Sequence, residues 1–370
     1  MATENLERKY MERAIELAKK AEGYTSPNPL VGAVIVKDGT IIGEGYHEKC
    51  GQLHAERNAI KALTQEAKEA TLYVTLEPCC HYGKTPPCTE AIIENQIGTV
   101  VIGSRDPNPL VAGKGAEQLR KAGIRVIEDF MREECDEINS IFFHYITTKT
   151  PYVAMKYAMT MDGKIATRTG ASKWITGECA REHVQTLRHK YKGIMVGIGT
   201  VLADDPMLNC RMEGGVDPVR IVCDTKLRIP AECKIVETAK NIPTIVATTR
   251  AAKESQGEKA KQLEHSGVQL VYVEDKEGHI DLSELMCKLG AMGIDSILLE
   301  GGGTLNDSMI QEDLVQCAYV YIAPKVFGGK DAKSPVEGIG VKVPSESIDF
   351  AFVDCQKIGQ DILLEYRRKK

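Results

Sequence analysis

The sequence contains no apolar segment long enough to cross a membrane. Its longest apolar runs, such as residues 31–36, are far shorter than the roughly 20 residues that a transmembrane helix needs. The first nine residues also lack the apolar core of an export signal. A basic excess is missing too, since 47 Lys and Arg stand against 52 Asp and Glu, a net charge of −5. These absences predict a cytoplasmic protein with no membrane partner, and they argue against nucleic acid as its main partner.

Length and composition are those of an ordinary globular protein. At roughly 150 residues per domain, 370 residues predict two domains or one large one. Hydrophobic residues make up 43% and charged residues 27%, which excludes a disordered or collagen-like chain. Because export is not expected, the twelve Cys are predicted to be thiols or metal ligands and not a disulfide framework.

The first 150 residues alternate between strand and helix patterns. A hairpin is expected at residues 31–37 and 40–46, around the turn Asp38-Gly39. The remaining elements are predicted as helices 6–21, 54–63, 88–95, 116–122 and 132–147, and strands 71–76, 99–102 and 124–127. Such alternation is typical of an α/β fold with a mostly parallel sheet.

The pattern restarts after Lys149-Thr150-Pro151, so we place a domain boundary near Lys149 and expect domains at residues 1–149 and 150–370. A second hairpin is predicted at residues 152–160 and 164–167, around Met161-Asp162-Gly163. Further predictions are strands 193–197, 219–223, 244–248, 268–273, 296–300 and 317–322, and helices 179–191, 255–265 and 282–292. More than 200 residues are enough for a separate core.

Three short motifs in the first half form a candidate metal site: His54-Ala55-Glu56, Pro78-Cys79 and Pro87-Cys88. One imidazole and two thiolates leave the fourth position of a zinc ion open for water, which is the catalytic arrangement. Zinc lowers the pKa of a bound water to about 7, and a carboxylate at Glu56 could move protons without binding the metal. Nucleobase deaminases share this signature, but their two Cys are three positions apart, whereas Cys79 and Cys88 are nine apart.

A structural zinc site is the alternative, because Cys80 or His81 could supply a fourth ligand. Glu56, two residues after the His ligand, and Cys88, at an apparent helix start, favour catalysis.

The string Glu77-Pro78-Cys79-Cys80-His81-Tyr82-Gly83-Lys84-Thr85-Pro86-Pro87-Cys88 closely resembles the bifunctional deaminase–reductase family of riboflavin biosynthesis, and the resemblance covers essentially the whole chain. It implies an N-terminal cytidine-deaminase-like zinc domain and a C-terminal dihydrofolate-reductase-like domain. It further implies one zinc per chain on His54, Cys79 and Cys88, with Glu56 as the proton shuttle. The residues expected around the deaminase substrate are Asn28, His47, His81, Lys84, Asp106 and Asn108.

In the second half, residues 157–166 resemble the opening of the reductases of the same pathway. The turn Gly301-Gly302-Gly303 follows a strand, and its backbone N–H groups could cradle a phosphate, although it is not the G-x-G-x-x-G motif of a Rossmann domain. The resemblance implies NADPH contacts at Ala158, Trp174, Thr200, Asp204, Thr225, Gly302, Gly303, Thr304, Leu305, Asn306, Asp307 and Ser308. It implies reductase substrate contacts at Ser172, Arg188, Leu208, Arg211 and Glu300.

The resemblance therefore predicts hydrolytic deamination of a diaminopyrimidinone ribosylamino 5′-phosphate, followed by NADPH-dependent reduction of its ribosyl group to ribityl. The partners expected are phosphorylated pyrimidines and a second copy of the chain, in a dimer or tetramer. One alternative is a nucleoside or tRNA deaminase with an accessory nucleotide-binding domain, and the net charge of −5 counts against RNA. Another is a zinc-stabilised scaffold without catalysis, against which Glu56 and the open zinc position argue.

Overall fold

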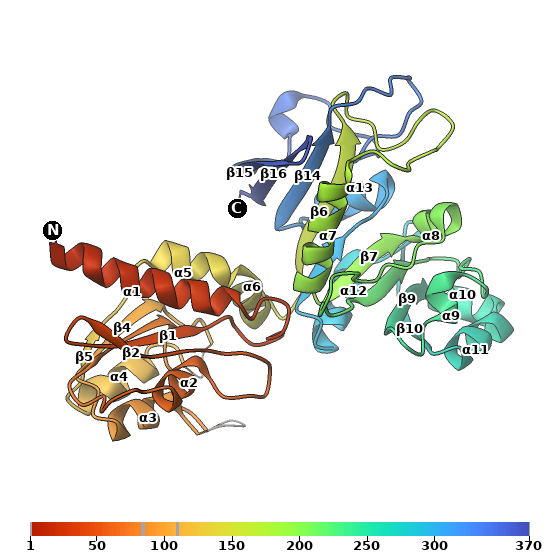
Figure 1. The fold of residues 1–370 in the computed structure, drawn as a ribbon. Coiled ribbons are helices and arrows are strands. Elements are labelled where there is room, and N and C mark those ends of the chain that lie inside the picture. The colour runs from red at the N-terminus through yellow and green to blue at the C-terminus, as the bar shows by residue number, and fades with distance from the viewer. Residues whose placement is uncertain (1, 83–85, 109–110, 370) are drawn as a thin grey trace. The chain divides into compact units, whose positions relative to one another are not determined.

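The computed structural model of the chain describes residues 2–82, 86–108 and 111–369, with side chains from residue 7 onward. The backbone forms two compact units, Met1–Lys149 and Thr150–Lys370 (Figure 1). Each unit has its own main sheet and its own hydrophobic cores. Each can therefore be described by itself.

The first unit is a five-stranded sheet in the order β2-β1-β3-β4-β5, with helices on both faces (Figure 1). Its strands are β1 (Gly32–Lys37), β2 (Thr40–Tyr46), β3 (Thr71–Leu76), β4 (Thr99–Ser104) and β5 (Arg125–Ile127). Its helices are α1 (Ala2–Lys19), α2 (Ala55–Lys61), α3 (Cys88–Glu94), α4 (Lys114–Lys121), α5 (Arg132–Ile138) and α6 (Ser140–Thr148). The predicted elements up to residue 127 are all present, with ends shifted by at most a few residues.

Two cores form on the two faces of this sheet because successive strand residues point in opposite directions. On one face Ile35, Leu72 and Ile102 pack against α2, α3 and α4. On the other, Val34 and Val101 pack with apolar side chains of α1 and with Cys135 of α5. Alternating apolar residues thus bury both faces of the sheet.

The prediction of a mostly parallel sheet is wrong for one strand of this unit, β1, which runs against the other four. Strand β1 is antiparallel to both β2 and β3, and only β3–β4 and β4–β5 are parallel pairs. The Asp38-Gly39 turn is too short for the crossover that a parallel pair needs, so β1 and β2 must be antiparallel.

The single helix predicted at residues 132–147 is also wrong, because Asn139 divides it into α5 and α6. Asn139 lies outside helical geometry, with φ −114° and ψ 16°. Its buried side chain accepts a hydrogen bond of 2.8 Å from Leu30 N and donates one of 2.9 Å to Leu30 O. This pairing with a distant loop is absent from any local sequence pattern, so the break could not be predicted.

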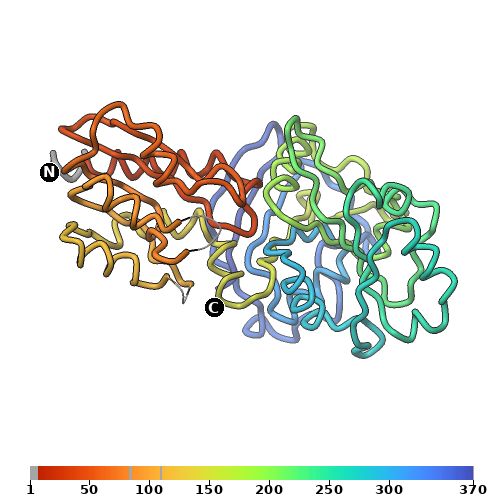
Figure 2. The backbone as a smooth tube through the Cα atoms, turned by 90° about the horizontal axis from the view of Figure 1, so that it is seen from below, coloured from red at the N-terminus to blue at the C-terminus, as the bar shows by residue number. Residues whose placement is uncertain are grey.

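The second unit is a nine-stranded sheet in the order β10-β9-β8-β7-β13-β6-β14-β16-β15. Its strands are β6 (Tyr152–Thr160), β7 (Gly193–Gly197), β8 (Val219–Cys223), β9 (Thr244–Thr249), β10 (Val268–Val273), β13 (Ser296–Leu299), β14 (Cys317–Ala323), β15 (Phe350–Ile358) and β16 (Asp361–Arg368), and β11 (Asp275–Lys276) pairs with β12 (His279–Ile280). Its helices are α7 (Glu178–Lys190), α8 (Ile198–Asp204), α9 (Lys234–Glu237), α10 (Arg250–Ser255), α11 (Gly257–His265), α12 (Leu282–Ala291) and α13 (Gly303–Gln311), with a 3-10 turn at Pro344–Glu346. Figure 2 shows the turquoise segment with β9 and β10 and the blue C-terminal strands on opposite sides of this unit.

The second predicted hairpin is wrong, because residues 164–167 form no strand. Strand β13 pairs only with residues 152–155 of β6, and β14 pairs with residues 154–160. Instead of pairing back with β6 as a strand, Ile165 N donates to Lys333 O at 2.9 Å, in the loop that follows β14. The C-terminal hairpin of β15 and β16 was not predicted. It joins the sheet through antiparallel pairing of β16 with β14.

Arg220 of β8 is fully buried and ties loops of the second unit to its sheet. Its guanidinium donates hydrogen bonds of 2.7–3.3 Å to neutral oxygens, namely the hydroxyls of Thr238 and Thr244 and the carbonyls of Met207, Ile235 and Ile242. Burial lowers its pKa to about 10, so the group stays protonated at neutral pH. The carbonyls replace water as the partners of a buried charge.

We expect Arg220→Met to lower the free energy of unfolding by about 3 kcal/mol or more, because several buried acceptors would lose their donor. Urea denaturation measures this loss. Arg250→Met is the matched control, since the Arg250 side chain is 72% exposed. A loss below about 1 kcal/mol at Arg220 would show that the buried network contributes little.

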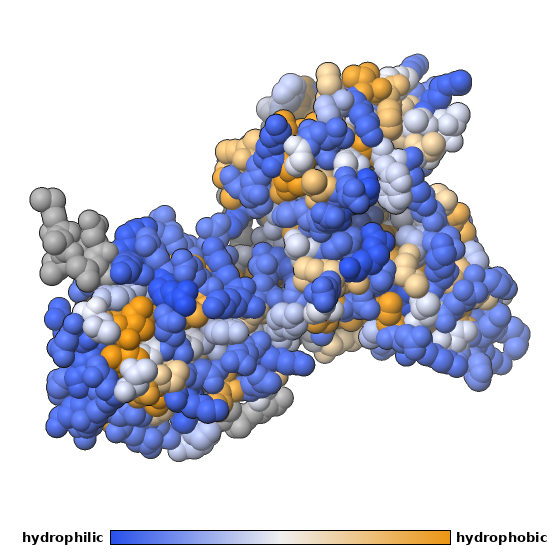
Figure 3. Space-filling view, viewed as in Figure 1, coloured by the Kyte–Doolittle hydropathy of each residue, from blue (hydrophilic) through white to orange (hydrophobic). Residues whose placement is uncertain are grey.

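Within the described residues, no helix combines the length and the apolar character needed to span a bilayer. The face shown in Figure 3 is mainly hydrophilic, with hydrophobic atoms in separate small patches.

Candidate active sites

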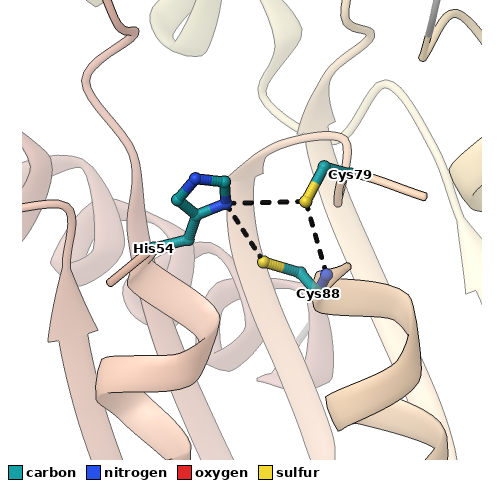
Figure 4. Close-up of side chains that lie close together, drawn as sticks. All are labelled: His54, Cys79 and Cys88. Carbon is teal, nitrogen blue, oxygen red and sulfur yellow. Dashed lines mark hydrogen bonds between the residues drawn. The ribbon is translucent and has the colours of Figure 1, made fainter. Parts of the chain in front are cut away.

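His54, Cys79 and Cys88 meet in the first unit, although the chain separates them by up to 34 positions (Figure 4). The Nδ1 atom of His54 lies 3.5 Å from Cys79 Sγ and 3.4 Å from Cys88 Sγ. A tetrahedral zinc with Zn–S of about 2.3 Å and Zn–N of about 2.0 Å separates N and S by about 3.5 Å. The donor set and its spacing therefore fit zinc.

Hydrogen bonds explain how the nine-position spacing still brings the two Cys together. The backbone N–H of Cys88, at the start of α3, donates to Cys79 Sγ at 3.3 Å. The Thr89 N–H and hydroxyl both donate to Cys79 O, at 3.2 and 3.3 Å. A hydrogen bond from the Cys88 thiol is the main cause that lowers the pKa of Cys79 to about 4, which favours the thiolate that binds metals.

Glu56 lies in the first turn of α2, which begins directly after His54. The carboxyl is 3% exposed and hydrogen-bonds to the Cys88 thiol. Burial raises its pKa, which brings the carboxyl closer to a range where it can both accept and donate a proton near neutral pH. Glu56 borders the same cavity as His54 and Cys79.

This cavity, of about 420 Å³, brings together five of the residues expected around the deaminase substrate: Asn28, His47, His81, Asp106 and Asn108. Lys84, the sixth, lies outside the described residues. A buried pair holds the position of two of them. His47 Nδ1 donates to Leu53 O at 3.0 Å, so Nε2 accepts from Asn28 Nδ2 at 3.1 Å. Burial lowers the pKa of His47, in keeping with a neutral ring.

Asp106 is a second buried group in the cavity wall. Burial raises the pKa of its carboxyl to about 6, and its Oδ1 accepts a hydrogen bond of 2.8 Å from Asn108 N. The Asp106-Pro107-Asn108 turn thus places two polar side chains, Asp106 and Asn108, in the cavity wall. A ring nitrogen or amine could bind there.

Sequence reasoning missed Glu77, which also borders the cavity. Its buried carboxylate accepts hydrogen bonds of 3.0–3.2 Å from the backbone N–H groups of Gly113, Gly115 and Ala116, at the start of α4. A buried carboxylate suits this helix end, where N–H groups lack helical partners. The residue just before Pro78-Cys79 therefore holds the zinc-ligand loop to α4. No local pattern distinguishes it from a surface Glu.

In the second unit, the residues expected around the cofactor lie at the carboxyl ends of neighbouring parallel strands. Thr200 follows β7, Thr225 follows β8, and Gly302 follows β13, while Ala158 lies on β6. A Cβ added to Gly302 would lie 4.0 Å from Thr200 Oγ1, so these two loops adjoin. Ligands of open α/β sheets bind at this edge.

Trp174 is 64% exposed, which excludes simple core packing as its role. The guanidinium of Arg181 lies 4.8 Å from its ring centroid. Beside it, Lys173 Nζ approaches Asp204 Oδ1 at 3.6 Å and links this loop to the end of α8. Ser172 is partly buried in the same loop.

The turn at residues 302–308 is the beginning of α13, with Gly302 as its N-cap. Part of it contacts the loop that follows β14. Asn306 is fully buried and its Nδ2 donates to Pro335 O at 2.8 Å, while Thr304 Oγ1 lies 3.3 Å from Glu337 Oε2. A Cβ on Gly303 would lie 2.4 Å from Glu337 Cγ, so only Gly fits there. Asn306 and Thr304 therefore shape the turn.

Two of the expected reductase substrate residues, Arg188 and Glu300, form a buried ion pair. Arg188 Nε and Nη2 bind the two carboxylate oxygens at 2.8 and 3.2 Å, and Nη1 donates to Asn209 O at 3.0 Å. Lys156 Nζ lies 3.5 Å from Glu300 Oε2. Leu208 is buried in the loop that Arg188 holds, and Arg211 is exposed.

Lys156 was not predicted. The signal was a single cation inside an otherwise apolar strand, β6. The side chain is 14% exposed, and its Nζ also lies 5.8 Å from the ring centroid of Tyr321. A buried Lys needs a partner, and the Glu300 that supplies it is 144 residues away in the chain.

Arg188→Met should destabilise the second unit in a pH-dependent manner. Burial alone would raise the pKa of Glu300, but Arg188 and Lys156 outweigh it and lower the pKa from 4.5 to about 2. A lowered pKa stabilises the fold above about pH 4.5, and this stabilisation disappears as the pH falls toward 2. We expect the variant to lose about 3–5 kcal/mol at pH 7 and much less at pH 3. Urea denaturation across this range measures the difference; an equal loss at both pH values would contradict the charge interaction.

Comparison with known proteins finds a family match in each unit. Residues 4–104 match the family described as cytidine and deoxycytidylate deaminase zinc-binding region, and residues 151–364 match the RibD C-terminal domain. An accessory nucleotide-binding domain, as in the tRNA deaminase alternative, does not account for the second match.

Similar proteins cover nearly the whole chain. A riboflavin biosynthesis protein RibD from Actinobacillus pleuropneumoniae is 54% identical over 96% of this chain and 94% of its own length. The structure of Acinetobacter baumannii RibD has a TM-score of 0.88 at 37% identity, covering 99% of this chain and 100% of that one. A Thermotoga maritima diaminohydroxyphosphoribosylaminopyrimidine deaminase/5-amino-6-(5-phosphoribosylamino)uracil reductase gives a TM-score of 0.88 at 39% identity, with the same coverage. The chain therefore belongs to the RibD family, the bifunctional deaminase–reductases of riboflavin biosynthesis.

Proposed function

We propose that the first unit deaminates 2,5-diamino-6-ribosylamino-4(3H)-pyrimidinone 5′-phosphate. The second unit then reduces the ribosyl group with NADPH to give 5-amino-6-ribitylaminouracil 5′-phosphate. The observation that carries the proposal is the cluster of His54, Cys79 and Cys88, with a buried Glu56 that borders the same cavity as His54 and Cys79. A structural zinc site would not need that buried carboxyl.

In the deaminase site, His54, Cys79 and Cys88 would hold zinc, which supplies a hydroxide nucleophile near neutral pH when bound. Glu56 takes a proton onto its carboxylate and delivers it to the leaving amine, so water and the ring C–NH₂ become a ring carbonyl and ammonia. Asn28, His47, Asp106 and Asn108 would orient the ring through its polar edge, with His81 and Lys84 nearby.

In the reductase site, the carboxyl ends of β6, β13, β7 and β8 would hold NADPH, through the residues placed there by the resemblance. The ring-opened ribosylamine is an imine, which accepts hydride at C1 and a proton at nitrogen to become the ribitylamine. Arg211 is exposed and suits the substrate phosphate. Arg188 is already bonded to Glu300, so in this proposal it holds Glu300 toward the substrate.

The test uses purified chain and the diaminopyrimidinone ribotide, with cytidine and CMP as comparison substrates. We expect zinc near one per chain, ammonia from the ribotide alone, and A340 loss that is faster with NADPH than with NADH. Deamination of cytidine at the rate of the ribotide would contradict the substrate assignment, and equal use of NADH would contradict the cofactor assignment. A cytoplasmic homo-oligomer remains a prediction.

A further inference from the structure

One wall of the deaminase cavity comes from α6, which lies outside residues 4–104 that match the cytidine deaminase family. Phe142, Tyr145 and Ile146 border the cavity together. Their spacing of three and four positions from Phe142 places them on one face of the helix. The substrate cavity therefore includes an apolar surface that the shared zinc-binding region does not provide.

Helix α6 is unusually apolar for a helix that has no buried residue. Five of its nine residues are Ile, Phe or Tyr, yet none of its side chains is fully buried. A helix this apolar normally buries one face. Because the cavity face is only partly covered by the protein, a ligand in the cavity would complete its burial.

The rest of the cavity lining includes polar side chains, among them His54, Glu56, Asn28 and Asp106. A pyrimidinone has the matching character, since its edge carries amine, carbonyl and ring nitrogens and its two faces are apolar. Proteins that act on a single base read the edge by hydrogen bonds and hold the faces between aromatic or apolar side chains.

Asn139 connects α6 to a polar part of the cavity lining. Its buried amide bonds both Leu30 N and Leu30 O, at 2.8 and 2.9 Å, and so joins the start of α6 to the loop that carries Asn28. The break at Asn139 also ends α5 and lets α6 begin at Ser140. One side chain thus connects the helix of the apolar wall to the loop of one polar lining residue.

We propose that Phe142 and Tyr145 form an aromatic wall that packs on the pyrimidine ring of the deaminase substrate and sets its affinity. The inference rests on the proposed function. The aromatic wall would pack on the ring and take no part in zinc binding or proton transfer. Its loss should therefore weaken substrate binding and leave the chemical step unchanged. Packing of an aromatic side chain on a base contributes about 1–3 kcal/mol, which corresponds to roughly a tenfold to hundredfold change in affinity.

The test compares Phe142→Ala and Tyr145→Ala with Phe143→Ala, a matched control on the same helix that does not border the cavity. Ammonia release gives KM and kcat, and zinc content is measured on each variant. We expect KM for the ribotide to rise at least tenfold in the two wall variants, with kcat within about threefold and zinc unchanged. Phe142→Tyr should return KM to within about threefold of the original chain.

An equal KM rise in Phe143→Ala, or loss of zinc in the wall variants, would overturn the proposal, because the effect would then come from disturbance of α6. An unchanged KM in both wall variants would also overturn it. Failure of the proposed function looks different, since the unmodified chain would then release no ammonia from the ribotide. Full zinc content shows that the first unit of each variant is folded, because the three ligands meet only in the folded unit.

Discussion

Cys79→Ser should abolish deamination and zinc binding and leave reduction intact. The Ser hydroxyl is a poor zinc ligand, and it would stand in place of a thiolate that lies 3.5 Å from His54 Nδ1. The metal site lies within the first unit, and Arg188, Glu300 and the glycine turn lie within the second. Zinc analysis, ammonia release from the diaminopyrimidinone ribotide and NADPH oxidation with the deaminated ribotide measure the three properties separately.

Cys80→Ser is the matched control, because Cys80 neighbours Cys79 but does not belong to the cluster of three possible ligands. It should keep full zinc and substantial ammonia release. Zinc loss in this control would mean that Cys80 is a ligand and would revive the structural, four-ligand reading of the site. Loss of both activities in folded Cys79→Ser would mean that the two sites share machinery.

Glu56→Gln should lower the rate of ammonia release by at least about 10²-fold while zinc remains bound. Gln keeps the size and part of the hydrogen bonding of Glu56 but cannot accept the proton that must reach the leaving amine. The buried position beside Cys88, and not merely its spacing from His54, is the reason to expect a large effect.

Glu56→Asp distinguishes proton transfer from packing, because it keeps the carboxyl and shortens its reach. It should retain more activity than Glu56→Gln. If Glu56→Gln lost its zinc, Glu56 would be a ligand; if it lost less than tenfold of the rate, another group would move the proton.

Local spacing explains why the zinc site could be predicted. The ligands and Glu56 lie in short motifs next to the ends of β3, α2 and α3, where the turn residues Pro78 and Pro87 mark the boundaries. The hairpin of β1 and β2 was likewise marked by Asp38-Gly39. In these cases each predicted element or ligand is marked by residues that lie next to it in the sequence.

The parts that escaped prediction depend on partners far away in the sequence. Asn139 breaks a helix because it pairs with Leu30. Residues 164–167 form no strand, and Ile165 N bonds instead to the distant Lys333 O. The role of Lys156 is visible only in the folded chain, where its ammonium group lies beside the Glu300 carboxylate. The fold class followed from periodicity, whereas these details follow from tertiary contacts.

In the proposed function, one chain carries two consecutive and separable reactions. The direct measurement adds the diaminopyrimidinone ribotide to the purified chain without NADPH, counts the ammonia released, and then adds NADPH while following A340. We expect one ammonia per substrate before NADPH is added, and afterwards one NADPH oxidised per ammonia released. Ammonia release that begins only when NADPH is present, or NADPH oxidation without prior ammonia release, would contradict the proposed function.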